Sequence, residues 1–309
     1  MEIKGALALS REYFEKYALP SLEENFPELS RRIAAGLVGN GSECFGFDDE
    51  LSRDHDWGED FFIWLKDEDR EFIPALSDWK RKLFEKHPGE HPKKRSAWGA
   101  DVGVMCVGDF YRSLTGCPDG PRTIPQWRAV PEEYLAMCVN GEVFLDNAGD
   151  FTAVRRYIAE HYPSQWRLKK LAAKCMAIAQ TGQYNISRCA KRGDLVALRA
   201  VLSRFQDAAM GAVFLIEKKF MPYYKWAWRA LSELSPLGKS VGELLYKMCL
   251  TSDSAELETH AQQVCDLIAA RLNEEGLTRR DAYFFTAQAE DIMKHITDPA
   301  LKNLPPQFE

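Results

Sequence analysis

Apolar residues recur every three or four positions through the first 35 residues, and prolines at positions 20 and 27 interrupt the pattern. This spacing predicts short helices that break at the prolines, because proline lacks the N–H group that would continue a helix. The next stretch, residues 33–46, passes from apolar residues into glycines. It predicts a strand that enters a tight turn.

Three more elements are expected before residue 120. The segment FFIWLK (61–66) is apolar and aromatic and predicts a second strand. Residues 69–87 are amphipathic, with an acidic start and a basic end that suit the helix dipole, and they predict a helix. The segment VGVMCVGDF (102–110) predicts a third strand, followed by a short helix and a connection rich in proline and glycine.

The pattern changes near residue 151, after which apolar residues keep helical spacing almost to the end of the chain. This pattern predicts helices at 151–162, 164–181, 193–219, 222–234, 237–250, 253–275 and 278–296. We therefore expect an N-terminal domain with both helices and strands at 1–150, in which residues 1–35 form a helical lead-in. An all-helical C-terminal domain is expected at 151–309.

Composition places the chain among cytoplasmic globular proteins. It has 309 residues, 46% of them hydrophobic, which suits one large or two modest domains. No apolar stretch approaches the ~20 residues of a membrane-spanning helix, and the charged N-terminus is unlike a signal peptide. The eight cysteines form no CxxC pair, which predicts reduced thiols and argues against a structural zinc site.

The motif with the clearest chemistry is GSECFG (41–46), followed by SRDHDW (52–57). Asp54 and Asp56 are two positions apart, so on a strand both carboxylates would project from one face. Adjacent carboxylates repel each other unless a cation lies between them, and Mg²⁺ prefers such oxygen ligands. Gly41 and Ser42 follow an apolar strand and offer backbone N–H groups and a hydroxyl to a phosphate. Together these features indicate nucleoside triphosphate chemistry.

The run GSECFGFDDELSRDHDW resembles the signature of the nucleotidyltransferase superfamily, the polymerase-beta-like fold. With GQYNISRCAKRGD and FMPYYKWAWRAL downstream, the chain is similar to an uncharacterised bacterial family of unknown function within that superfamily. The resemblance implies an α+β fold: a nucleotidyltransferase-like N-terminal domain with a small mixed sheet, followed by an all-helical C-terminal domain.

The resemblance also implies a Mg²⁺-dependent transfer of a nucleoside monophosphate, AMP from ATP in the first instance, onto an acceptor hydroxyl. Asp54 and Asp56 would be catalytic and bind two Mg²⁺ ions, while Gly41 and Ser42 would contact the triphosphate of ATP or another nucleotide. The acceptor, a small molecule or a macromolecule, is left open. The superfamily usually supplies a third carboxylate, for which the candidates are Asp101 and Asp109, with Glu142 and Asp146 as further choices.

A second group of candidates lies in the helical half. Tyr184, Arg188 and Arg192 have helical spacing, and Lys225 stands among aromatic residues. They could form a cationic wall for the triphosphate, with Tyr184 near the base. Alternatively, they are ordinary surface cations beside a helix boundary, and Lys225 extends along a core helix.

The distribution of charge sharpens the choice of ligand. The net charge of −6 argues against extended nucleic acid as the partner. Residues 43–60 contain eight acids and one base, whereas residues 155–229 contain 15 Lys/Arg and 4 Asp/Glu. This contrast favours one triphosphate with its metal, although the acids could also form a merely solvated loop. Two other functions stay open: a catalytically degenerate nucleotide-binding or sensing protein, and an RNA-modifying enzyme.

Overall fold

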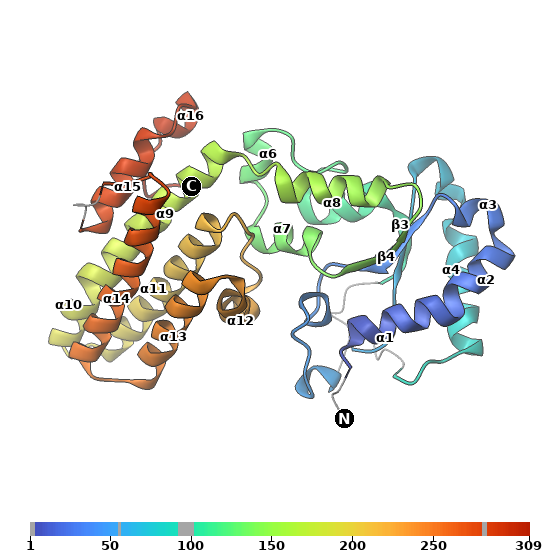
Figure 1. Ribbon diagram of the computed structural model, residues 1–309, viewed down its shortest axis with the longest axis horizontal. Coiled ribbons are helices and arrows are strands. Elements are labelled where there is room, and N and C mark those ends of the chain that lie inside the picture. The colour runs from blue at the N-terminus through green and yellow to red at the C-terminus, as the bar shows by residue number, and fades with distance from the viewer. Residues whose placement is uncertain (1–3, 55–56, 92–101, 280–282) are drawn as a thin grey trace. The chain divides into compact units, whose positions relative to one another are not determined.

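The computed structural model describes residues 4–54, 57–91, 102–279 and 283–309, with Asp54 described through its backbone alone. The chain forms two compact units, Met1–His161 and Tyr162–Glu309 (Figure 1). The first contains a small sheet. In the described part of the second, all the regular elements are helices, joined by loops. The expected α+β fold is therefore confirmed.

Four strands form the sheet of the first unit: β1 (Ala34–Leu37), β2 (Phe62–Leu65), β3 (Val104–Cys106) and β4 (Glu142–Asp146). Their order is β3-β2-β1-β4, in which β1 is antiparallel to β2 and β4, and β2 is parallel to β3. The sheet is thus mixed, as expected. The sequence pattern did not predict β4, because its apolar run of three residues is short and becomes a strand by pairing with β1.

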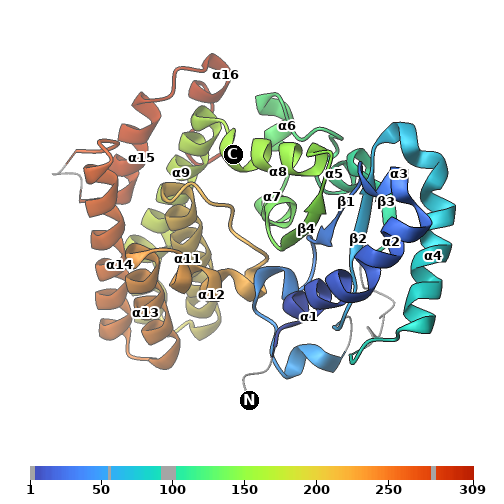
Figure 2. The same cartoon turned by 45° about the vertical axis from the view of Figure 1, so that its right-hand side comes forward.

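Helices cover both faces of this sheet (Figure 2). On one face, Phe14 and Phe61 pack with Leu76 in a single apolar core. On the other face, Trp64 stacks on Phe151 at 3.8 Å between ring centroids. The helices of this unit are α1 (Ala6–Tyr13), α2 (Leu19–Asn25), α3 (Pro27–Ser30), α4 (Ile73–Lys86), α5 (Val107–Thr115), α6 (Ile124–Arg128), α7 (Glu132–Val139) and α8 (Asp150–Glu160).

Two expectations about local structure in this unit are wrong. Pro20 does not break the first helix: a π-helical turn, Phe14–Ala18, joins α1 to α2, and its wider hydrogen bonding accommodates the proline that follows. The third strand covers only Val104–Cys106, because α5 begins at Val107 instead of continuing the strand.

The second unit is a bundle around the long helix α11. Its helices are α9 (Ser164–Ile178), α10 (Ile186–Lys191), α11 (Leu195–Ile216), α12 (Tyr224–Leu234), α13 (Pro236–Leu250), α14 (Ser254–Glu274), α15 (Phe285–Lys294) and α16 (Pro299–Lys302). A π-helical turn, Ala179–Asn185, joins α9 to α10. The expected helix at 278–296 begins only at Phe285. Among the residues described here, no helix is long and apolar enough to cross a membrane.

Candidate functional site

The loop after β1 carries Gly41 and Ser42. Gly39 and Gly41 have φ values of 116° and 123°, which favour glycine over every other residue. The Asn140 side chain fixes this loop by pairing with both polar groups of Gly39: the Gly39 N–H donates to Oδ1 at 2.8 Å, and Nδ2 donates to the Gly39 carbonyl at 2.7 Å. The conformation of the loop therefore depends on a residue 101 positions later in the chain.

The turn that contains Asn140 is itself fixed by Arg155 on α8. Arg155 Nη2 donates to the carbonyls of Val139 and Gly141 at 2.8 and 3.1 Å. Burial lowers the pKa of this guanidinium. The Gly141 N–H in turn donates to the Cys44 carbonyl at 2.7 Å. Arg155 belongs to the basic segment that was expected to face phosphates. It instead stabilises the glycine loop indirectly, through the turn that contains Asn140.

Glu43 adds a buried carboxylate to this loop, and it was not among the predicted site residues. It is 4% exposed, and a Cβ atom placed on Gly41 would lie 2.5 Å from its Oε2. The carboxylate therefore packs against the α-carbon of Gly41, in the space that any larger residue would fill. Its position directly after Ser42 was the feature of the sequence that could have indicated a carboxylate in the loop.

The acidic turn that follows is held by its own side chains. Asp48 Oδ2 accepts hydrogen bonds from the Ala6 N–H at 2.8 Å and from Trp57 Nε1 at 2.7 Å. Asp49 Oδ1 accepts from the backbone N–H groups of Leu51 and Ser52, both at 3.0 Å. These bonds stabilise a 3₁₀ turn, Leu51–Asp54. Asp54 therefore ends a 3₁₀ turn, and its expected placement on a strand is wrong.

Two more acids of this region are buried and paired. Glu59 accepts hydrogen bonds from the backbone N–H groups of Glu90 and His91. Asp60 forms an ion pair with Lys80 at 2.6 Å. The interpretation as a solvated acidic loop therefore fails for Asp48, Glu59 and Asp60. Asp56 and the side chain of Asp54 lie outside the described residues, so their expected roles stay predictions.

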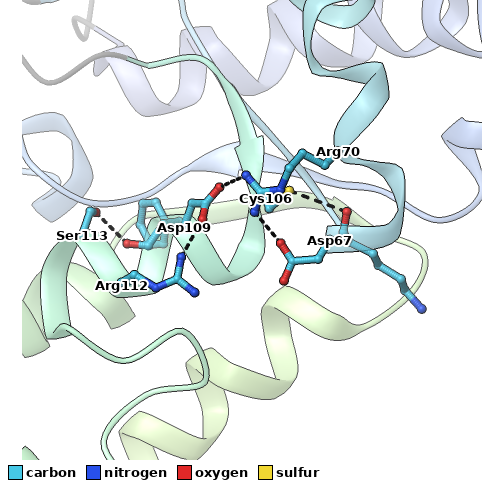
Figure 3. Close-up of polar contacts among 8 residues, drawn as sticks. Asp67, Arg70, Cys106, Asp109, Arg112 and Ser113 are labelled. Carbon is cyan, nitrogen blue, oxygen red and sulfur yellow. Dashed lines mark hydrogen bonds and ion pairs between the residues drawn. The ribbon is translucent and has the colours of Figure 1, made fainter.

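Asp109, a candidate third carboxylate, lies in the first turn of α5 and contacts two arginines (Figure 3). Its oxygens accept hydrogen bonds from Arg70 at 2.6 Å and from Arg112 at 2.8 Å. The bond from Arg70 lowers the pKa of Asp109 most strongly. Such pairing favours a structural role. Asp101, the other candidate, lies outside the described residues.

The further acidic candidates on β4 also have partners. Glu142 forms an ion pair with Arg11 on α1. Asp146 accepts hydrogen bonds from the backbone N–H groups of Gly149 and Thr152, where α8 begins. Within the described part of the chain, no group of three or more His, Cys, Asp or Glu residues could hold a metal ion. All eight cysteines are free.

In the second unit, Tyr184 and Arg188 form a pair at the surface. The Arg188 guanidinium lies 4.4 Å from the centre of the Tyr184 ring and donates a hydrogen bond to its hydroxyl. Arg192, also exposed, follows α10. The residues one position before this pair, Gln183 and Ser187, line a polar cavity of about 490 Å³. The expected grouping of Tyr184 with Arg188 is therefore present.

Lys225 belongs to a different part of the unit. It lies in the first turn of α12, with its Nζ 4.9 Å from the centre of the Trp226 ring. Arg192 precedes the N-terminus of α11 and Lys225 follows its C-terminus. Because α11 has 22 residues, its two ends lie about 33 Å apart at 1.5 Å per residue. The π-helical turn that carries Tyr184 packs against the middle of this helix, since Gly182 contacts Phe205, whereas Lys225 follows its C-terminal end.

Some cations of the basic segment serve the bundle itself. Arg167 donates to the Leu215 carbonyl at 3.0 Å, and burial lowers its pKa. Lys169, which is fully buried, donates to the carbonyls of Pro305 and Pro306 at 2.7 and 3.0 Å, and also to that of Phe308. The positive charge of the segment is therefore partly structural.

Comparison with known proteins gives one family match. A family model described as "Domain of unknown function (DUF4037)" matches residues 127–227, from α6 to α12. The matched range includes Asn140 and Arg155, which fix the glycine loop, and also the Tyr184 pair and Lys225. Comparisons with curated proteins and with solved structures returned no match.

Proposed function

We propose that the protein is a Mg²⁺-dependent nucleotidyltransferase that moves a nucleoside monophosphate, AMP from ATP, onto an acceptor hydroxyl. The geometry of the glycine loop is the observation that carries the proposal. The loop follows a buried strand, Gly41 in it is half-buried with φ 123°, and Asn140 holds the backbone of Gly39 by two hydrogen bonds. A fixed turn of this kind suits a phosphate, because its position does not have to be ordered when the ligand binds.

Ser42 supports the same role. It stands at the N-cap of the 3₁₀ turn Glu43–Phe45, yet its side chain makes no capping hydrogen bond to that turn. An N-cap serine ordinarily accepts, through its side-chain oxygen, a hydrogen bond from a backbone N–H of the first turn. The hydroxyl of Ser42 can therefore serve a ligand that lies against the loop.

A triphosphate carries several negative charges, and a divalent cation offsets them; carboxylate oxygens are ligands that suit Mg²⁺. Asp54 and Asp56 would hold the ions. When bound, Mg²⁺ activates the acceptor hydroxyl and neutralises charge on the phosphates. Gly41 and Ser42 would position the triphosphate.

Transfer of label from [α-³²P]ATP tests the proposal. The acceptors are supplied in two pools, a small-molecule extract of bacterial cells and total RNA, each with Mg²⁺. We expect labelled product from the wild type and none from Asp54→Asn/Asp56→Asn. Glu50→Gln is the matched control, because Glu50 is an exposed acid of the same turn, and it should keep the wild-type rate.

Equal labelling by the wild type and Asp54→Asn/Asp56→Asn would contradict the assigned roles. Mg²⁺-dependent ATP binding without transfer to either pool would contradict the transferase and favour the nucleotide-sensing alternative. Label in the RNA pool alone would identify the protein as an RNA-modifying enzyme and fix the acceptor class.

A further inference from the structure

The first unit contains a cavity that is lined by helices and loops. Its volume is about 670 Å³, within the range of small-molecule sites. The walls come from α1, the π-helical turn Phe14–Ala18, the end of α4, residues 87–91 and Arg53. Neither Gly41 nor Ser42 lines it.

Aromatic side chains make one wall of the cavity rigid. The Tyr13 ring stacks on Phe84 at 4.5 Å, and its hydroxyl donates to the His87 carbonyl at 2.6 Å. The Tyr17 ring stacks on the His87 ring at 4.6 Å with an interplanar angle of 15°. Tyr17 and His87 are half-buried. The Lys16 Nζ lies 4.9 Å from the centre of the Tyr17 ring, so the two stacked rings and this cation together form a partly exposed wall of the cavity.

Glu59 fixes the loop that follows His87. Its carboxylate accepts the backbone N–H groups of Glu90 and His91, at 3.0 and 2.8 Å. Gly89 has φ 76°, and a Cβ atom there would lie 3.1 Å from the Glu59 carboxyl carbon. Gly89 thus leaves room for the Glu59 carboxylate, and this carboxylate holds the backbone of the loop. The cavity is therefore formed before any ligand binds.

Cations from three separate segments line the same space: Lys16, Arg53 and Lys86. A fourth, Lys4, is paired with Glu12 at 2.6 Å. Of the acids that line the cavity, Glu12 is neutralised by that ion pair and Glu59 faces backbone N–H groups, which leaves Glu90 as the remaining carboxylate. The local balance around the open space is therefore positive.

We propose that this cavity binds a phosphorylated small molecule. Its phosphate would contact Lys16, Arg53 and Lys86, and its planar or apolar part would lie on the Tyr17–His87 wall. A phosphate is favoured over a single carboxylate because three cations from different segments match a group with several charged oxygens. This cavity is lined by neither Gly41 nor Ser42, although Arg53 directly precedes Asp54, and the proposed binding requires no metal.

Calorimetric titration with phenyl phosphate tests the site in the presence of EDTA, with the full-length protein. Phenyl phosphate joins one phosphate to one planar ring. We expect saturable binding at one site, and an affinity about tenfold weaker or worse in Lys16→Gln/Lys86→Gln, because each lost charged contact weakens binding. Lys82→Gln is the matched control: Lys82 lies on α4, is paired with Asp78 and does not line the cavity.

Two additional titrations separate this site from the proposed nucleotide site. Benzyl alcohol has the ring without the phosphate and should not bind measurably. Asp54→Asn/Asp56→Asn should bind phenyl phosphate with wild-type affinity, whatever it does to ATP. The proposal is overturned if phenyl phosphate does not bind, if Lys16→Gln/Lys86→Gln binds it as well as Lys82→Gln does, or if benzyl alcohol binds equally well.

Discussion

The buried ion pair between Lys80 and Asp60 allows a quantitative test of the fold of the first unit. Lys80 Nζ lies 2.6 Å from Asp60 Oδ1 and donates to the carbonyls of Phe61 and Val102 at 2.6 and 3.0 Å. The side chains are 9% and 6% exposed. Lys80 therefore joins α4 to the start of β2 and to the residue that leads into β3.

The change Lys80→Met keeps an unbranched side chain that is one atom shorter and removes its charge. It leaves the Asp60 carboxylate buried beside two carbonyls without their ammonium donor. Removal of one partner of a buried pair costs about 3–5 kcal/mol. With a urea dependence of about 2 kcal/mol per molar, this cost lowers the midpoint of unfolding by roughly 1.5–2.5 M.

Urea unfolding followed by circular dichroism measures this shift. Lys82→Met is the matched control on the same helix, because Lys82 pairs with Asp78 at 2.7 Å but is 65% exposed. An exposed pair contributes about 0–1 kcal/mol, so the control should unfold close to the wild type. The double variant Asp60→Asn/Lys80→Met should lose less stability than the two single changes added together.

Equal midpoints for Lys80→Met and Lys82→Met would refute this reasoning. Such a result would mean that Lys80 contributes to the first unit no more than a surface lysine does. A loss in the double variant equal to the sum of the single losses would show that the two charges are not coupled.

Three further predictions concern other parts of the chain. Gly41→Ala should destabilise the protein more than Gly46→Ala in thermal unfolding, because a Cβ at Gly41 meets a carboxylate whereas one at Gly46 meets nothing within 4 Å; equal losses would contradict the packing of the loop. Lys169→Met should release residues 305–308 to limited proteolysis, because their carbonyls lose a buried donor; unchanged protection would contradict that role. Arg70→Gln should raise the pKa of Asp109, measured by NMR titration, towards its ordinary value. Because the folded pKa of Asp109 is lowered, the stability from this pair is present at neutral pH and is lost as the pH falls through that pKa, and Arg70→Gln should weaken this acid dependence.

The spacing of apolar residues predicted most of the helices and strands and their order along the chain. The spacing of apolar residues predicts long amphipathic helices such as α11 and α14. The apolar run FFIWLK predicts β2, which is one of the two inner strands of the sheet. The strand β4 could not be predicted, because it depends on a partner elsewhere in the chain, and helical spacing alone does not distinguish a π-helical turn from a break in the helix. β4 forms by pairing with β1, and the turn before Pro20 forms where the proline withholds a donor.

The sequence predicted only part of the candidate site. Glycines in a turn after a strand indicated the loop, but its support by Asn140 and Arg155 depends on residues more than a hundred positions away in the chain. The acidic run looked uniform in sequence, yet tertiary contacts give Asp48, Glu59 and Asp60 structural roles. No spacing rule distinguishes such acids from metal ligands, because burial and donor geometry decide between them.

Calorimetric titration of ATP into the wild type and Asp54→Asn/Asp56→Asn, with Mg²⁺ or with EDTA, tests the central claim most directly. The proposed metal site requires that the wild type bind ATP with Mg²⁺ at a site that is lost in EDTA and lost in the double variant; any binding that remains in EDTA must disappear in Lys16→Gln/Lys86→Gln, which removes two cations of the separate cavity. ATP binding of equal affinity in EDTA, or in the double variant with Mg²⁺, would contradict it.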